Sequence, residues 1–395
     1  MERAVRVPLR DDDGTRTAVR RLTLTGFRCY TRLRLELGPE PVVLTGPNGA
    51  GKTNLLEAVS FLTPGRGLRR AKLAEVARLG GAASWAVAAE VQSAGQATAI
   101  GTGWSGGDGP DKRLVRMDGQ PLRTTADLGR VLPVLWLTPA MDRLFVEGAT
   151  HRRRFMDRMV NALDPGHAER SAAYIRAMRQ RLALLKEGRR ETAWLGALEA
   201  VMAAQGVAVA AARCDWILRV APMAAEGHGP FPGCGLSVSG GLEASLREGA
   251  SALGVEDGFR DRLAATRGLD ATAGTTTEGP HRSDLEAVHL AKDMPAHLAS
   301  TGEQKALLIG LMLAQAKVLT QGRAVPPLLL LDEVAAHLDG SRRAALFDVL
   351  VGFPGQSWLT GTDAALFAAL EGRARFLTVA DAAVTGESDS PSNED

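Results

Sequence analysis

Residues 46–54 read Gly-Pro-Asn-Gly-Ala-Gly-Lys-Thr-Asn and have the spacing of a phosphate-binding loop, with four residues between the first glycine and Gly-Lys-Thr. The glycines of such a loop let several backbone N–H groups converge on one phosphate. The lysine reaches the terminal phosphates, and the adjacent hydroxyl binds Mg²⁺. We therefore predict that Lys52 and Thr53 bind a nucleoside triphosphate and its metal. The predicted nucleotide-binding residues of the loop are Gly46, Pro47, Asn48, Gly49, Ala50, Gly51, Lys52, Thr53 and Asn54.

A strand of four aliphatic residues, 328–331, ends in Asp332 and Glu333. Four aliphatics in a row are typical of a strand buried on both faces, and the carboxyl end of such a strand is where phosphates bind in α/β proteins. We predict that Asp332 holds Mg²⁺ and that Glu333 polarises the water that attacks the γ-phosphate. Taken alone, the same pattern also fits an ordinary strand followed by a turn.

Residues 299–305 form a second Ser/Gly-rich sequence before an apolar helix, and a helix N-terminus of this kind suits an anion. One triphosphate cannot easily be enclosed by both helix ends of one rigid fold, so we expect this segment to cap the nucleotide of another copy. The alternative is a simple capping box formed by Ser300 and Glu303. The predicted signature residues are Ser300, Thr301, Gly302, Glu303 and Gln304.

These candidates have to be positioned by an α/β fold with a helical insertion. Strand patterns surround the phosphate loop at 22–45 and 84–119, whereas residues 141–218 have helical periodicity with interruptions at 163–166 and 186–188. Residues 222–235 are rich in Pro and Gly and are predicted to be a connector. Strand patterns return at 236–238 and after 285.

Composition indicates a soluble globular protein of two lobes: the chain has 395 residues, 45% hydrophobic residues and a net charge of +2. Its three cysteines are too few for a disulfide framework or a zinc site, which favours a reducing compartment and a cytoplasmic protein. No secretory signal is predicted, because the N-terminus mixes Arg, Asp and Glu and has no apolar core. No transmembrane segment is predicted either, because charged and polar residues interrupt the alanine-rich stretch from Trp194 to Val220. With so small a net charge, nucleic acid would have to bind a local basic patch.

The phosphate loop, the signature, the acidic strand and the loop at 336–339 together resemble the ATP-binding-cassette superfamily. Five further segments narrow the resemblance to the RecF family of bacterial DNA replication and repair proteins, in the SMC-like branch; they are residues 24–30, 65–69, 151–157, 279–285 and 360–363. The resemblance covers roughly residues 20–380.

This resemblance implies an ATP-binding-cassette-type (SMC-like) ATPase head with a mixed sheet and a helical second domain. It also implies ATP-dependent dimerisation, binding to duplex DNA and single-strand gaps, and help in loading RecA together with RecO and RecR. Hydrolysis is expected to be slow, DNA-stimulated and used for release. The expected domains are an extension at 1–20, the first part of the head at 21–140, the helical domain at 141–269, the second part of the head at 270–382 and a disordered acidic tail at 383–395.

Carried over to this sequence, the resemblance places Arg28 near the phosphates and Ser300 and Gly302 in trans. Three departures are visible. Glu303 precedes Gln304 in the signature, residues 136–142 contain no glutamine, and Thr360 or Thr362 occupies the region of the transporter-type switch histidine. His281 and His337 are interpreted as structural histidines beside turns.

Two arginine clusters are DNA-binding candidates, namely Arg66, Arg69 and Arg70 after the first helix, and Arg152, Arg153 and Arg154 in the insertion. Arginine contacts to phosphates would be independent of sequence and sensitive to salt. For residues 152–154 the sequence leaves subunit contact and a solvated helix face open. Two rival functions are a non-hydrolytic ATP-gated DNA clamp or adaptor and, less favoured, a transporter ATPase subunit.

Overall fold

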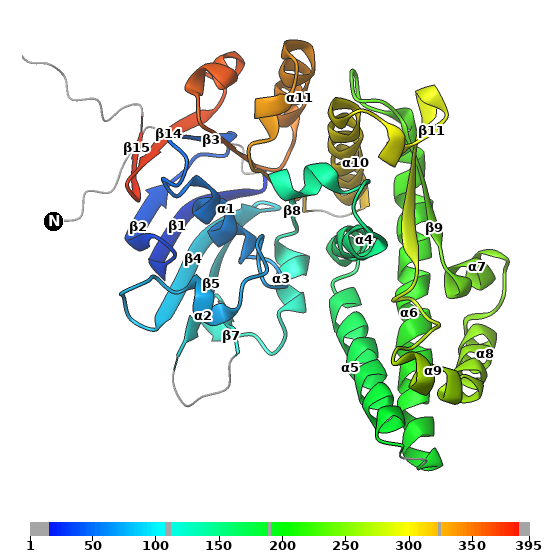
Figure 1. Cartoon of the computed structure of the whole chain (residues 1–395). Coiled ribbons are helices and arrows are strands. Elements are labelled where there is room, and N and C mark those ends of the chain that lie inside the picture. The colour runs from blue at the N-terminus through cyan, green and yellow to red at the C-terminus, as the bar shows by residue number, and fades with distance from the viewer. Residues whose placement is uncertain (1–15, 107–111, 189–190, 323–324, 387–395) are drawn as a thin grey trace, which may run out of the picture. The chain divides into compact units, whose positions relative to one another are not determined.

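The computed structural model describes residues 16–106, 112–188, 191–322 and 325–386. They divide into two compact units (Figure 1): one comprises the described residues up to Met141 and from Ala316 onward, and the other is Asp142–Gln315. The predicted domain boundary at 141 lies at this division, whereas the one at 270 lies inside the second unit, within α9 (Arg267–Ala273).

The first unit contains an antiparallel sheet with the strand order β2-β1-β4-β5-β6-β7. Its strands are β1 (Ala18–Phe27), β2 (Tyr30–Glu36), β4 (Ser84–Ser93), β5 (Gln96–Ser105), β6 (Leu114–Met117) and β7 (Gln120–Pro121). β1 begins three residues before the predicted start of the head, because residues 18 and 19 already pair with β4. Within the strand region predicted at 84–119, residues 107–111 lie outside the described residues.

A second sheet of the same unit has the strand order β15-β14-β3-β13-β12-β8. Its strands are β3 (Val42–Thr45), β8 (Val134–Leu137), β12 (Leu328–Leu331), β13 (Ser357–Gly361), β14 (Arg375–Ala380) and β15 (Ala383–Gly386). All neighbours are parallel except β14 and β15. β15 includes residues 383–386, which the sequence assigned to a disordered tail, because they pair with β14; residues 387–395 lie outside the described part.

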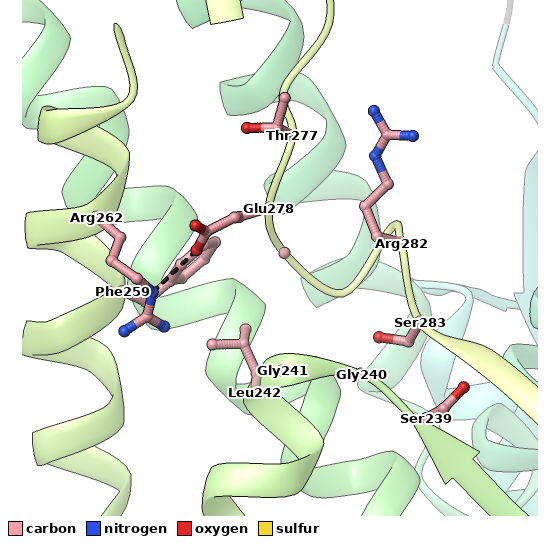
Figure 2. Close-up of a pocket in the computed structure, with 11 residues that line it drawn as sticks. Ser239, Gly240, Gly241, Leu242, Phe259, Arg262, Thr277, Glu278, Arg282 and Ser283 are labelled. Carbon is pink, nitrogen blue, oxygen red and sulfur yellow. Dashed lines mark hydrogen bonds and ion pairs between the residues drawn. The ribbon is translucent and has the colours of Figure 1, made fainter. Parts of the chain in front are cut away.

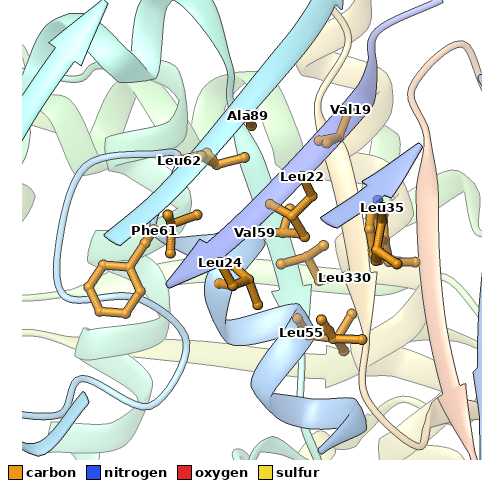
Figure 3. Packing of buried hydrophobic residues seen from close by; sticks show 14 of the residues in the cluster. Val19, Leu22, Leu24, Leu35, Leu55, Val59, Phe61, Leu62, Ala89 and Leu330 are labelled. Carbon is orange, nitrogen blue, oxygen red and sulfur yellow. The ribbon is translucent and has the colours of Figure 1, made fainter. Parts of the chain in front are cut away.

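Both sheets and the helix α1 (Lys52–Ser60) share one hydrophobic core. Figure 3 shows Leu22 and Leu24 of β1, Leu55 and Val59 of α1 and Leu330 of β12 packed together. This packing fixes α1 directly behind the phosphate loop. The remaining helices of the unit are α2 (Leu73–Val76), α3 (Ala126–Val131), α11 (Gly340–Gly352), and the 3₁₀ segments η4 (Val334–His337) and η5 (Ala364–Leu370); η1 (Pro139–Arg143) spans the division between the units.

The second unit is mainly helical, and α5 and α6 run side by side in opposite directions (Figure 1). Its helices are α4 (Ala149–Leu163), α5 (His167–Lys186), α6 (Thr192–Glu226), α7 (Gly241–Arg247), α8 (Ala252–Ala265) and α9, with the 3₁₀ segments η2 (Leu290–Lys292) and η3 (Ala296–Leu298). A small sheet has the order β11-β10-β9, from Met294–Pro295, Asp284–His289 and Cys234–Ser239. α10 (Thr301–Gly322) begins in this unit, and the division falls within it.

α6 corrects one prediction, because it continues through Pro222, where the sequence predicted the start of a connector. A proline removes the hydrogen bond to the carbonyl four residues earlier, here that of Leu218. Both Pro222 and Leu218 are exposed, so water can replace the lost partner. The connector is therefore shorter than predicted.

By length and composition alone, α6 is also the single helix among the described residues that could cross a membrane. Half of its apolar window is buried inside the protein, and core helices of soluble proteins pass the same test. Its Glu199 and Arg213 are buried in ion pairs with Arg181 and Asp157, as a packed helix requires. This supports the interpretation of α6 as a core helix.

Candidate functional site

The phosphate loop follows β3 and has a backbone that only glycine adopts readily at three positions. Gly46, Gly49 and Gly51 have φ angles of 141°, 81° and 118°. A Cβ on Gly46 would lie 2.0 Å from the backbone oxygen of Val379, and one on Gly51 would lie 2.6 Å from the hydroxyl of Tyr30. The loop therefore wraps tightly before α1, as a phosphate cradle requires.

Lys52 begins α1, and its ammonium group lies over the loop. Nζ donates hydrogen bonds to the carbonyls of Gly46 at 2.6 Å and Pro47 at 2.8 Å. Burial lowers the pKa of Lys52, and the nearby Glu333 and Asp332 partly offset this effect. The positive charge is thus held where the loop and the acidic strand meet.

Thr53 and Asp332 meet at the end of the sheet, although 279 residues separate them. The Thr53 hydroxyl donates to Asp332 Oδ1 at 2.9 Å. Strand order explains this contact: β13 lies between β3 and β12, and the carboxyl ends of parallel strands meet at one edge. A hydroxyl beside a carboxylate is an oxygen donor set that fits Mg²⁺.

Thr360, at the end of β13, is a site residue that the sequence identified only as a replacement for the switch histidine. Its hydroxyl donates to Asp332 Oδ1 at 2.8 Å and accepts the backbone N–H of Glu333 at 2.9 Å. Glu333 has a φ of 53°, an uncommon value for a residue other than glycine. Thr360 therefore fixes both the predicted metal ligand and the turn that carries the predicted catalytic carboxylate.

Arg28, predicted near the phosphates, is bound to the buried Glu57 of α1. Its Nε and Nη2 contact the two Glu57 oxygens at 2.8 and 2.7 Å, and its φ is 52°. Arg69 contacts the same carboxylate at 2.9 Å and Asn54 Oδ1 at 2.6 Å. Glu57 thus joins Arg28 to the DNA-binding candidate Arg69, which in turn contacts the loop residue Asn54. The nucleotide role of Arg28 stays a prediction.

The segment that carries the first arginine cluster is held by Arg113, the residue before β6. This buried guanidinium donates to the carbonyls of Thr63 at 3.1 Å, Gly65 at 2.9 Å and Phe61. Burial lowers the pKa of Arg113 to about 10. The anchored segment presents Arg66 and Arg70 as exposed residues.

The predicted signature lies in the second unit, at the start of α10. Ser300 donates its backbone N–H and its hydroxyl to Glu303 Oε2 at 3.0 and 2.9 Å, so the Glu303 half of the predicted capping box is formed. Thr301 and Gly302 are exposed. Gln304 is buried and donates to the Ala299 carbonyl at 2.8 Å. Two of the five signature residues are therefore engaged with each other, while two face solvent.

The second arginine cluster divides by role. Arg152 forms a two-point contact with Asp284, with Nε–Oδ1 and Nη2–Oδ2 distances of 2.9 and 2.6 Å. Arg153 donates to the Ser283 carbonyl at 2.8 Å. Both tie α4 to the start of β10, whereas Arg154 is exposed. The geometry favours Arg154 over its neighbours as a candidate for DNA contact.

A cavity of about 360 Å³ lies in the second unit, near residues 277–283 (Figure 2). Arg262 and Glu278 form an ion pair of 2.9 Å beside it. None of the residues predicted to bind nucleotide, metal or DNA lines this cavity. Nearby, His281 contacts the Tyr174 hydroxyl at 2.8 Å and the Thr276 carbonyl at 2.9 Å, which agrees with a structural histidine. The side chain of His337 lies outside the described residues.

Comparison with known proteins identifies the family. The RecF/RecN/SMC N terminal domain family matches residues 18–353. A DNA replication and repair protein RecF of Mesorhizobium japonicum is 52% identical over 365 residues, which cover 92% of this chain and 96% of that protein. The protein of the same name from Allorhizobium ampelinum is 49% identical over 368 residues, covering 93% and 98%. The resemblance drawn from the sequence is confirmed.

Solved structures show the same fold. A structure of the recombination mediator protein RecF-ATPrS in the RecFOR pathway has a TM-score of 0.82 at 21% identity, covering 94% of this chain and 98% of that one. The SmcHead bound to the C-winged helix domain of ScpA gives 0.51 at 13% identity, covering 93% and 96%. The predicted fold class, an SMC-like ATPase head with a helical insertion, is confirmed.

Proposed function

Since this chain belongs to the RecF family of DNA replication and repair proteins, we propose that it is an ATP-dependent DNA-binding ATPase of recombinational repair and replication restart. The observation that supports this most directly is the joining of the phosphate loop to the acidic strand through Thr53, Asp332 and Thr360. A nucleotide site is thereby assembled from segments that lie far apart in the sequence.

ATP binds in the loop of residues 46–54, through backbone N–H groups other than at Pro47, with Lys52 at the terminal phosphates and Arg28 nearby. Thr53 and Asp332 hold Mg²⁺, which neutralises charge on the phosphates when bound. Glu333 orients and polarises the attacking water. Because Thr360 holds the Glu333 backbone in place, hydrolysis depends on the geometry of this turn. It is slow and serves as a release step.

Two copies dimerise through ATP, with residues 300–304 of each copy facing the nucleotide of the other. A solved structure named RecF-ATP supports ATP binding by a similar fold, with a TM-score of 0.80 and 21% identity. Exposure of Thr301 and Gly302 agrees with a contact made in trans. Dimerisation therefore depends on bound ATP.

The dimer binds duplex DNA and single-strand gaps. Arg66, Arg70 and Arg154 contact phosphates, while Arg69, Arg152 and Arg153 position the segments that carry them. The protein helps to load RecA with RecO and RecR in the cytoplasm; the name RecFOR pathway, given for the similar structure, supports these partners. A transporter role has lost its support, because the family is one of DNA replication and repair.

To test this function, the molecular mass of the full chain is measured in solution with and without ATP and Mg²⁺. Duplex DNA binding is measured in the same samples. We expect ATP to double the mass and to raise DNA affinity, and both effects to be lost in Lys52→Ala and Ser300→Arg. A chain that stays monomeric and binds DNA equally without nucleotide would contradict the proposal. If the Glu333→Gln dimer stays trapped on DNA, release by hydrolysis is supported. If Glu333→Gln dissociates from DNA like the wild type, a non-hydrolytic clamp is favoured.

A further inference from the structure

One ion pair beside the signature has no part in the proposed function: Lys292 Nζ contacts Glu303 Oε1. The other carboxylate oxygen, Oε2, accepts the N–H and the hydroxyl of Ser300. Both oxygens of Glu303 therefore have partners. Glu303 is also the residue by which this signature departs from the pattern with Gln directly after Gly302.

Helix capping explains the position of Glu303 but does not require its charge. A capping box accepts glutamine as well as glutamate, since a neutral amide oxygen can receive the same two hydrogen bonds. The positive end of the helix favours the carboxylate, yet it favours a phosphate for the same reason. An acid at this position thus competes with the anion that the signature is proposed to bind.

Lys292 reaches Glu303 from a different element. It is the last residue of η2, in the turn between β10 and β11, and it precedes Asp293, whose φ of 45° turns the chain back. The lysine side chain is 52% exposed and that of Glu303 is 19% exposed. Because its cation is half exposed to solvent, the pair contributes little to the stability of the fold. We therefore ask whether the Lys292–Glu303 pair affects the binding of the triphosphate by the signature.

Glu303 is ionised across the neutral range. The hydrogen bond from Lys292, together with those from Ser300, lowers the pKa of Glu303 to about 2. A full negative charge thus lies directly beside Ser300, and Lys292 is the cation that contacts it.

We propose that Lys292 is a positioning residue of the signature, which neutralises Glu303 and holds its carboxylate so that the signature accepts the triphosphate bound by a second copy. This inference rests on the proposed ATP-dependent dimer. Without Lys292, the carboxylate repels the phosphates, and like charges placed together at an interface lower its affinity. With Lys292 present, the β10–β11 turn and the start of α10 form one composite surface.

The test measures the dissociation constant of the dimer by sedimentation of the full chain with ATP and Mg²⁺. We expect Lys292→Met to weaken dimerisation about tenfold. Glu303→Gln keeps the cap and should dimerise at least as tightly as the wild type. The double variant should lie within about threefold of the wild type. Because charge repulsion is screened by salt, the loss in Lys292→Met should shrink at high salt.

Arg260→Met is the matched control, since it removes a similarly exposed partner of Asp257 in the same unit and should leave the dissociation constant unchanged. Thermal unfolding of each variant confirms that it is folded. If Lys292→Met dimerises like the wild type, or the double variant is as weak as Lys292→Met, the inference is wrong. If Ser300→Arg also dimerises normally, the proposed trans contact is wrong as well; if Ser300→Arg is monomeric, only the role of Lys292 falls.

Discussion

Thr360 makes two hydrogen bonds at the end of the sheet, and both depend on its hydroxyl. One goes to the carboxylate of Asp332, and the other comes from the backbone of Glu333. The residue is 1% exposed, so water is not at hand to substitute for its hydroxyl. Loss of the hydroxyl leaves the part-buried N–H of Glu333 without this partner, at a cost of up to about 1–3 kcal/mol.

Thr360→Val, which removes the hydroxyl and keeps the shape, should therefore lower ATP hydrolysis more than ATP binding. We expect a loss in kcat of about 10²-fold, the scale seen when one positioned catalytic contact is removed. ATP affinity should fall less, because Lys52 and the glycine loop are unchanged. Hydrolysis and nucleotide binding are measured on the same preparations.

Thr360→Ser is the control and should retain most of the activity, since it keeps the hydroxyl. Equal hydrolysis by Thr360→Val and the wild type would show that the Glu333 turn does not need this side chain.

At the scale of elements, Arg213 of α6 joins α4 to the segment before β10. It contacts both oxygens of Asp157 at 2.9 and 3.1 Å and donates to the Pro280 carbonyl at 2.6 Å. Arg213 Nη1 also forms an ion pair with Glu243 Oε1 of α7 at 3.1 Å. Burial disfavours the charge of Asp157, but the hydrogen bond from His167 and the charge of Arg213 outweigh it and lower its pKa to about 2.

This network predicts a loss of stability in acid. The pKa of Asp157 is lowered from its usual 3.8, so its contribution is complete above pH 3.8 and disappears as the pH falls toward 2. The contribution is about 1–2 kcal/mol, after allowance for partial exposure of the side chain. Urea unfolding at pH 6 and pH 3 should show a smaller loss of stability in Asp157→Asn than in the wild type.

Asp215→Asn is the comparison variant, because its exposed pair with Arg219 adds little at either pH. An equal pH dependence of the wild type and Asp157→Asn would contradict the low pKa of Asp157.

Elements that depend on local pattern could be predicted from the sequence, and contacts that depend on strand order could not. The glycine loop and the aliphatic strand before Asp332 are each visible in fewer than about ten residues. Thr360 gains its role because β13 lies between β3 and β12, an order that no local pattern reveals. Likewise, Arg152 belongs to a run of arginines typical of a surface, yet it binds Asp284, which is 132 residues away.

At the scale of the whole molecule, the proposed site needs two chains, because its phosphate loop and signature are expected to act on one nucleotide from different copies. A variant with a defective phosphate loop and a variant with a defective signature should then complement each other in a mixed dimer. A Ser300→Arg chain keeps an intact phosphate loop, and a Lys52→Ala chain keeps an intact signature. Their heterodimer would contain one complete site of two.

Mixing Lys52→Ala with Ser300→Arg should therefore restore ATP-dependent dimers and part of the hydrolysis that each variant alone lacks. Sedimentation and phosphate release report the two effects, and restored hydrolysis should not exceed about half of the wild-type rate, since one site in each pair is complete. The control mixture pairs Lys52→Ala with a chain that carries both substitutions; it contains no complete site and should stay inactive. If the first mixture also stays inactive while both variants are folded, the two halves do not act across the dimer. Ser300 would then have to act within its own chain, and nucleotide binding would require another route to dimerisation.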